Sequence, residues 1–199
     1  RTANAHKEVV TEAEALALSV MAKQVWKNPV AVKLISEGER EVSAFWSTPE
    51  YGAAKARFDV LNPNHFVDIK TTAEISPGAF RSTAAKMGYH IQCGWYQCGL
   101  RELTGNLLPV YIVCVESDPP HDVAVYEYDE IALAAGRDVA QGVAKKYREC
   151  EKAGVWPGVQ ADIQSLKLPT WMMTGDNPLA LRAAGEVDIS NGTMEATEL

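Results

Sequence analysis

Residues 56–72 read ARFDVLNPNHFVDIKTT, and this stretch decides the fold that we expect. Two runs rich in β-branched and aromatic residues flank Asn62-Pro63-Asn64, three residues that strongly favour a turn. We therefore predict two strands, near 53–61 and 65–71, that pair as a hairpin.

Side chains along the second strand should alternate between its two faces. Asp68 and Lys70 then share one face, while Val67 and Ile69 point to the other face and into the core. If the turn is centred on the Pro63-Asn64 bond, the numbers of facing residues sum to 127. This register places Asp59 opposite Asp68.

Two facing carboxylates repel each other unless a cation lies between them. The same register places Arg57 opposite Lys70. Oxygen ligands at close range suit Mg²⁺ or Mn²⁺, with water and phosphate oxygens completing the coordination. With Lys70 beside a bound water or phosphate, the arrangement suits metal-assisted phosphodiester hydrolysis. The alternative for such residues, taken alone, is an ordinary solvated hairpin.

Other segments of the chain show clear helical or strand patterns. Thr11 and Glu14 form a capping-box pattern at the start of a helix over about 12–26. Further elements are expected as a short helix through Leu34, a strand at 42–47, a helix over 77–104, strands at 110–116 and 123–129, and a helix over 129–152. This order predicts an α/β domain whose central sheet is flanked by helices.

Composition limits the class of protein. The chain has 199 residues, of which 47% are hydrophobic, and a formal net charge of -7. No apolar run approaches the roughly 18 residues of a membrane span, and no signal-peptide pattern opens the sequence, so we expect a cytoplasmic protein without a membrane partner. Four cysteines without a CxxC pair are expected to be reduced and mostly buried: Cys93, Cys98, Cys114 and Cys150.

Gln92 and Tyr96 lie four residues apart in the expected helix over 77–104, so they share one helix face. An amide and a phenol in these positions could reach the sheet edge that carries the carboxylates. The alternative is a core helix with two incidental polar groups.

Together these residues resemble the PD-(D/E)XK nuclease superfamily, in its RecB-like branch with a Q-xxx-Y signature. The amino-acid sequence of these motifs is most similar to that of phage and prophage exonucleases of the RecE (exonuclease VIII) type. The stretches that carry the resemblance are KARFD at 55–59, VDIKTTAEI at 67–75, YHIQCGWY at 89–96, WPG at 156–158 and LPTW at 168–171.

The resemblance implies a restriction-endonuclease-like core and a Mg²⁺-dependent exonuclease, with Mn²⁺ as a substitute. Such an enzyme degrades the 5′-ended strand of linear double-stranded DNA and leaves a 3′ overhang for a single-strand annealing protein in recombination. It also implies a toroidal homo-oligomer. By matching position, the metal ligands are Asp59, Asp68 and the carbonyl of Ile69, and Lys70 activates or orients the water.

The resemblance also implies supporting roles for residues around that centre. Gln92 and Tyr96 would support the site and contact the DNA backbone, and Thr71, Thr72 and Arg57 would bind DNA. Thr71 and Thr72 have an equal alternative as local caps of a strand end. Glu41 matches a glutamate that lies near the site in relatives.

One departure concerns the amino-terminal side. Relatives carry an upstream G-xxx-H helix whose histidine adds a metal ligand, and this sequence has no such motif. We expect one nuclease domain over 1–175, possibly lacking that helix, and an acidic, flexible tail over 176–199. A structure-specific endonuclease on the same core and a noncatalytic DNA-binding or oligomerisation fragment remain alternatives.

The charge distribution is compatible with a DNA partner. Residues 51–104 contain six bases and four acids, a local charge of +2, so the rest of the chain carries -9. Two of those four acids are the proposed metal ligands, whose charge a divalent ion would offset. We therefore expect DNA to bind at a local positive surface.

Overall fold

The computed structural model describes residues 9–158, 163 and 165–167. The chain divides into two units, residues 1–156 and 157–199, and the fold described below belongs to the first. The expected tail over 176–199, the predicted boundary at residue 175 and the LPTW stretch lie outside the described residues.

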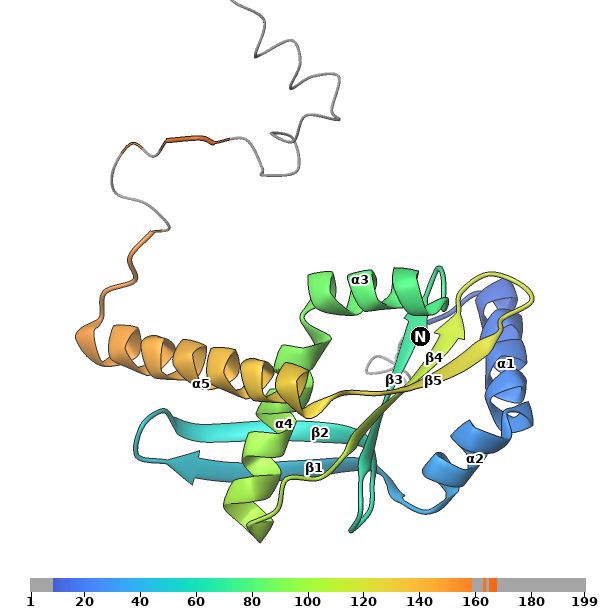
Figure 1. Cartoon of the computed structure of the whole chain (residues 1–199), viewed down its shortest axis with the longest axis horizontal. Helices are drawn as coiled ribbons and strands as arrows, with labels where there is room; N and C mark the ends of the chain where they lie inside the picture. Colours follow the sequence, from blue (N-terminus) through green and yellow to red (C-terminus); the bar gives the residue numbers. More distant parts are fainter. Residues whose placement is uncertain (1–8, 159–162, 164, 168–199) are drawn as a thin grey trace, which may run out of the picture. The chain divides into compact units, whose positions relative to one another are not determined.

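The first unit contains five helices and five strands among its described residues (Figure 1). In chain order they are α1 (Glu12–Lys27), α2 (Pro29–Ser36), β1 (Glu39–Thr48), β2 (Gly52–Leu61), β3 (Phe66–Thr72), α3 (Pro77–Met87), α4 (Tyr89–Thr104), β4 (Val110–Glu116), β5 (Val123–Glu127) and α5 (Glu130–Ala153).

The five strands form one mixed sheet in the order β1-β2-β3-β4-β5. The β3–β4 pair is parallel and the other three pairs are antiparallel. A parallel pair requires a long crossover connection, and α3 and α4 supply it between β3 and β4. The predicted α/β fold with a central mixed sheet flanked by helices is confirmed.

Local sequence signals begin and end the first two helices as expected. The Thr11 hydroxyl accepts a hydrogen bond from the Glu14 N–H at 3.2 Å, and the Glu14 carboxylate accepts one from the Thr11 N–H at 2.7 Å. Asn28 then caps α2 by accepting from the N–H groups of Val30 and Ala31. Pro29 occupies the first turn of α2, where its missing N–H has no cost.

The helix predicted over 77–104 is wrong in one respect, because the structure has two helices there. Gly88 adopts a left-handed backbone conformation with a φ of 69° and ends α3. A residue in this conformation cannot continue an α-helix, and glycine adopts it without steric cost. The chain therefore changes direction at Gly88, and α4 begins at the next residue.

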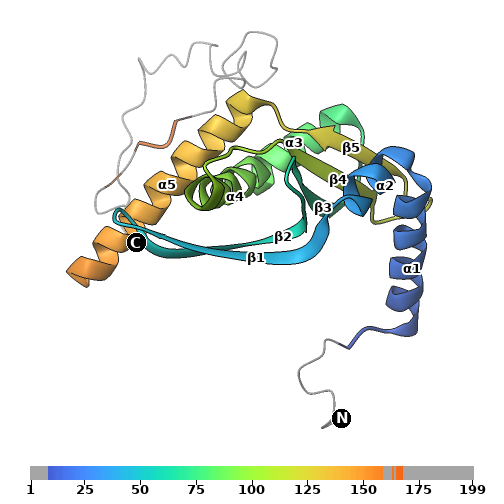
Figure 2. The ribbon, with the colours of Figure 1, turned by 90° about the horizontal axis from the view of Figure 1, so that it is seen from below.

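Two hydrophobic clusters cover opposite faces of the sheet. The larger cluster lies beneath α3, α4 and α5 and includes Phe58, Phe66 and Leu133. The smaller one lies beneath α1 and α2 and includes Val60 and Val67. Figure 2 shows α4 and α5 together on one side of the sheet, while α1 and α2 lie apart from them.

Ile69 corrects an expectation about the core, and two tryptophans differ in burial. Trp26 is 49% exposed and its ring contacts the Arg40 guanidinium, whereas Trp46 is buried. Ile69 is 39% exposed, although its face was expected to be buried. The second cluster covers Val67 and ends before Ile69.

Two further sequence expectations concern cysteines and membrane spans. All four cysteines are free and buried, as predicted. Among the helices of the described part of the chain, none combines the length and the hydropathy that a membrane crossing requires.

Candidate active site

The site begins where β2 and β3 separate. Their ladder contains only the pairs Val60–Val67 and Leu61–Phe66, whose numbers both sum to 127. The predicted hairpin register is therefore confirmed. β2 remains paired with β1 at every residue except Asp59, while β3 pairs with β4, so β2 and β3 part beyond Val60.

This separation corrects the two facing pairs that we expected. Asp59 and Asp68 do not pair in the ladder, and neither do Arg57 and Lys70, because the ladder has already ended. Phe58 and Val60 also lie in opposite clusters, although residues two apart in a regular strand share a face. β2 therefore departs from regular alternation around Asp59.

The Asp59 side chain spans the gap between the two strands. Its Oδ2 accepts a hydrogen bond from the backbone N–H of Ile69 at 2.7 Å. The N–H and C=O of one strand residue point toward the same neighbour, so the Ile69 carbonyl also faces this opening. Asp59 and the Ile69 carbonyl thus lie on the same side of β3.

Asp68, Lys70 and Gln92 form a connected polar group beneath α4. Gln92 donates from Nε2 to Oδ1 of Asp68 at 3.0 Å and accepts at Oε1 from Lys70 Nζ at 3.0 Å. Lys70 Nζ lies 2.7 Å from Oδ2 of Asp68 as an ion pair. The pair is not aligned as a hydrogen bond, which leaves this Oδ2 buried without a hydrogen-bond partner among the described residues.

Helix α4 contributes two tyrosines to the same group. Tyr96 accepts a hydrogen bond at its hydroxyl from Gln92 Nε2 at 3.3 Å, and its ring packs edge-on against Phe58. Tyr89, which the sequence analysis missed, places its ring 4.7 Å from Lys70 Nζ. Because Tyr89 lies three residues before Gln92, helical spacing could have revealed this shared face.

Burial and charge shift the ionisation of the central pair. Burial raises the pKa of the Asp68 carboxyl above its ordinary value, against the opposing effect of Lys70. Burial alone would lower the pKa of Lys70, but the close negative charge of Asp68 outweighs it, so the pKa of Lys70 is raised. Lys70 is therefore a cation at neutral pH and suits charge stabilisation better than proton abstraction.

Tyr128 is a second buried group near this site that the sequence did not reveal. Its hydroxyl is buried without a hydrogen-bond partner in the described residues. Burial raises the pKa of Tyr128, and the charges of Cys93 and Asp68 raise it further. Tyr128 thus remains a protonated donor, and it also lines a groove of about 610 Å³ between α3 and α5.

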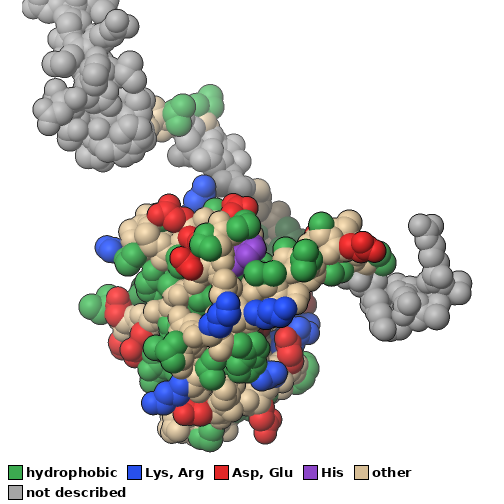
Figure 3. All heavy atoms as spheres, turned by 90° about the vertical axis from the view of Figure 1, so that its right-hand side faces the viewer, with side chains coloured by type: hydrophobic (Ala, Val, Ile, Leu, Met, Phe, Trp, Pro, Cys, Tyr) green, Lys and Arg blue, Asp and Glu red, His purple; other side chains and the backbone are tan. Residues whose placement is uncertain are grey.

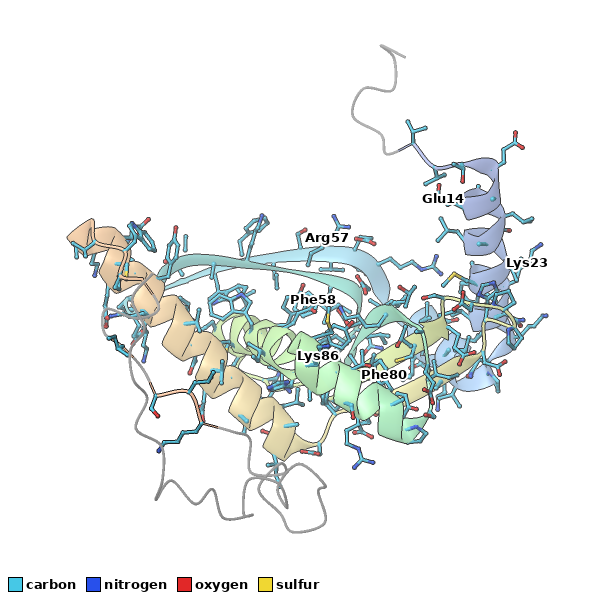
Figure 4. The ribbon with its side chains drawn as sticks, turned by 90° about the horizontal axis from the view of Figure 1, so that it is seen from above. Glu14, Lys23, Arg57, Phe58, Phe80 and Lys86 are labelled. Carbon is cyan, nitrogen blue, oxygen red and sulfur yellow. The ribbon has the colours of Figure 1, made fainter. Side chains whose placement is uncertain are left out.

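The residues expected to bind DNA lie around the edge of this group. Arg57 is exposed on β2 and forms an ion pair with Glu41 on β1 at 2.5 Å. Figure 4 shows Arg57 and Phe58 pointing to opposite sides of β2. Thr71 is exposed, whereas Thr72 is buried and its hydroxyl donates to the Glu74 carbonyl at 3.2 Å. Thr72 therefore has the geometry of a local cap.

The donor set fits a hard divalent cation. Asp68 has a buried oxygen without a hydrogen bond, and Asp59 and the Ile69 carbonyl face the opening beside it. Carboxylate and carbonyl oxygens are the ligands that Mg²⁺ and Mn²⁺ prefer. The described residues contain no cluster of three His, Cys, Asp or Glu side chains placed for a metal.

One family of known proteins matches most of the chain. Residues 2–169 match the family described as a PDDEXK-like domain of unknown function. The chain belongs to this family. The match spans the described fold, including both carboxylates, Lys70 and Gln92. No curated protein sequence has detectable similarity to the chain.

A solved structure shows the same fold at low sequence identity. A crystal structure described as a "Putative exonuclease" from Eubacterium rectale is 17% identical, with a TM-score of 0.64 over 83% of this chain and 67% of that one. LHK-Exo, solved in complex with dAMP, is 15% identical, with a TM-score of 0.37 over 74% of this chain and 77% of that one.

These findings place the chain at the level of fold and broad activity. The PDDEXK-like domain and the mixed sheet confirm the expected superfamily and fold class. The family supports a hydrolytic nuclease that binds DNA and uses a divalent metal ion.

Proposed function

We propose that the chain is a Mg²⁺-dependent exonuclease that degrades the 5′-ended strand of linear double-stranded DNA and leaves 3′ overhangs for recombination. The observation that carries the nuclease assignment is the meeting of Asp68, Lys70 and Gln92 beside Asp59 where β2 and β3 separate. Strand polarity rests on the resemblance to RecE-type exonucleases.

In this proposal Asp59, Asp68 and the Ile69 carbonyl hold Mg²⁺ or Mn²⁺. A bound divalent ion would polarise the phosphate and lower the pKa of a coordinated water. Lys70, held as a cation by Asp68, stabilises negative charge that develops on the phosphate. Its ammonium group also orients the attacking water.

Gln92 and Tyr96 act by positioning the central pair. Gln92 bonds both Asp68 and Lys70, so it fixes the distance between the carboxylate and the cation. Tyr96 bonds Gln92 and packs against Phe58, which joins the group to the core. Arg57 and Thr71 contact the DNA backbone at the rim of the site, whereas Thr72 acts as a local cap.

Other parts of the proposal follow from the resemblance alone. These are a toroidal homo-oligomer and a single-strand annealing protein that receives the 3′ overhang, whereas the proposed cytoplasmic location rests on composition. The local charge of +2 over residues 51–104 is compatible with a DNA partner. On the side of the fold that carries α1 and α2, Figure 3 shows several Lys and Arg side chains near the middle and most acidic side chains toward the edges.

The test is digestion of linear duplex DNA, labelled separately at its 5′ and 3′ ends, with Mg²⁺ or Mn²⁺. We expect loss of the 5′-ended strand and a strong loss of rate in Lys70→Ala and Asp68→Ala, with wild-type rates in the control Lys145→Ala on α5. Unchanged activity in either site variant would refute the site.

The same assay separates the alternatives. Cleavage of covalently closed circular DNA would indicate a structure-specific endonuclease, because an exonuclease requires an end. Duplex binding without any metal-dependent product, at any protein concentration, would indicate a noncatalytic DNA-binding or oligomerisation fragment.

A further inference from the structure

Strands β1 and β2 form a two-stranded ribbon that is paired from Ser43–Arg57 to Thr48–Gly52. Its inner face packs on α4 through an aromatic group of Trp46, Tyr51 and Trp95. The Trp95 indole N–H donates to the carbonyl oxygen of Lys55 at 3.2 Å, which attaches β2 to the helix. The ribbon is therefore supported from one side by a packed core.

The opposite side of the ribbon combines small, basic and aromatic side chains. This outer ribbon face consists of Ser43, Phe45, Ser47, Ala53, Lys55 and Arg57. Figure 2 shows no described helix lying over it. It is thus a solvent-facing surface on a rigid support, within the part of the chain that the structure describes.

Phe45 is the unusual residue of this face. Its side chain is 68% exposed, and Lys55 lies directly across the ladder from it. Its outward neighbours along β1 are Ser43 and Ser47, and Ala53 lies across from Ser47. Small side chains therefore flank the ring along β1. A planar ligand could therefore approach the ring without steric obstruction.

The charges of the outer ribbon face are complementary to a phosphate chain. Lys55 and Arg57 occupy successive outward positions of β2, about 7 Å apart along a strand, and Asp59 follows two residues later. Arg57 forms an exposed ion pair with the carboxylate of Glu41. Exposed ion pairs contribute little free energy, so a phosphate can replace this partner.

We propose that the outer ribbon face binds single-stranded DNA, with Phe45 stacking on a base and Lys55 and Arg57 contacting successive phosphates next to the site. Surfaces that bind single strands combine an aromatic ring with basic side chains, because every nucleobase has a face that can stack on the ring. In duplex DNA the nucleobases are already stacked on each other, so they have no free face for Phe45. This inference rests on the proposed nuclease function, since it assigns the path of a separated strand.

The experiment measures binding by fluorescence anisotropy, with the full 199-residue chain, EDTA and a labelled mixed-sequence DNA oligonucleotide. Phe45→Ala should weaken single-strand binding roughly tenfold and blunt-duplex binding much less. Lys55→Gln should lower the slope of log affinity against log salt by about 0.7. The exposed residues Ile131 and Lys145 on α5 provide matched controls as Ile131→Ala and Lys145→Gln, which should bind as wild type.

Each other outcome overturns the inference. Wild-type affinity for single strands in Phe45→Ala, or equal loss for single strands and blunt duplex, would remove Phe45 as a stacking residue. A change in oligomeric state by sedimentation, with DNA binding unchanged, would make the face an interface between copies. Failure of the nuclease proposal would be seen separately, as full cleavage by Asp68→Asn in Mg²⁺. DNA binding is measured in EDTA, so it does not depend on cleavage.

Discussion

The Oδ2 atom of Asp59 on β2 accepts a hydrogen bond from the backbone N–H of Ile69 on β3 at 2.7 Å. This contact lies immediately beyond the last ladder pair of the two strands, Val60–Val67. One side chain thus replaces the missing ladder at the point where the strands separate, and the same carboxylate is a proposed metal ligand.

Substitutions of Asp59 should separate these two roles. Asp59→Asn retains an oxygen acceptor but not the charge, so we expect near-wild-type stability and loss of metal-dependent cleavage. Asp59→Ala should also lose about 1–2 kcal/mol of unfolding free energy, because the Ile69 N–H loses its partner. Urea denaturation and a cleavage assay would measure both. Equal stability of the two variants would contradict a structural role for the hydrogen bond.

Substitutions of Gln92 should test positioning of the central pair. Gln92→Ala removes the bonds to both Asp68 and Lys70 and should lower the cleavage rate roughly 10- to 100-fold. Gln92→Glu should tighten Mn²⁺ binding, measured by calorimetry, because a further carboxylate facing Asp68 is repelled by it unless a cation lies between them. The control is Gln141→Ala on α5. A full rate in Gln92→Ala would contradict this role.

Two glycines of α5 should respond to alanine in opposite directions. A Cβ at Gly136 would overlap the carbonyl oxygen of His90 on α4, whereas a Cβ at Gly142 meets nothing within 4 Å. We expect Gly136→Ala to cost about 3 kcal/mol by forcing the helices apart. Gly142→Ala should gain about 1 kcal/mol from its greater helix propensity. Denaturant unfolding of both proteins measures the difference, and a stable Gly136→Ala would contradict the close packing.

The buried thiols should resist modification in the native protein. Burial raises the pKa of the thiols of Cys93, Cys98 and Cys114, for Cys114 to about 12. Ellman's reagent, which reacts with thiolates, should therefore detect no fast-reacting thiol in the native state at pH 8 and four in denaturant. Native labelling as fast as that of free cysteine would contradict this burial.

The same shifts have a defined sign for stability. The unfolded chain ionises its thiols at their ordinary pKa, while the folded state keeps these protons to a higher pH. Above the ordinary pKa of a thiol, the unfolded state therefore binds fewer protons than the folded state. The free energy of unfolding should fall as the pH rises through this range. Urea midpoints between pH 7 and 10 would measure this fall, and replacing Cys114 by Ala should reduce its steepness.

Local patterns predicted much of the fold. Thr11 and Glu14 cap α1 as their spacing indicated, and Asn62-Pro63-Asn64 produce the predicted register. Gly88 shows the limit of this reasoning. Its helical neighbours favoured one long helix, and the sequence alone did not show that Gly88 would take a left-handed conformation.

Burial was harder to predict than secondary structure, because it depends on what the rest of the chain places nearby. Ile69 follows the alternation of β3, yet it is partly exposed because the cluster beneath α1 and α2 ends before it. Trp26 has helical spacing, but α1 has no buried residue and Trp26 contacts Arg40.

The sequence by itself determined most of the elements, the hairpin register and the residue types of the site, because turns, caps and alternation depend on neighbours within a few residues. Only the tertiary structure decided that Gln92 bridges Asp68 and Lys70, that Tyr89 lies over Lys70, and that Asp59 bonds Ile69. These contacts join different elements, and their geometry follows from how α4 packs on the sheet and where β2 leaves β3.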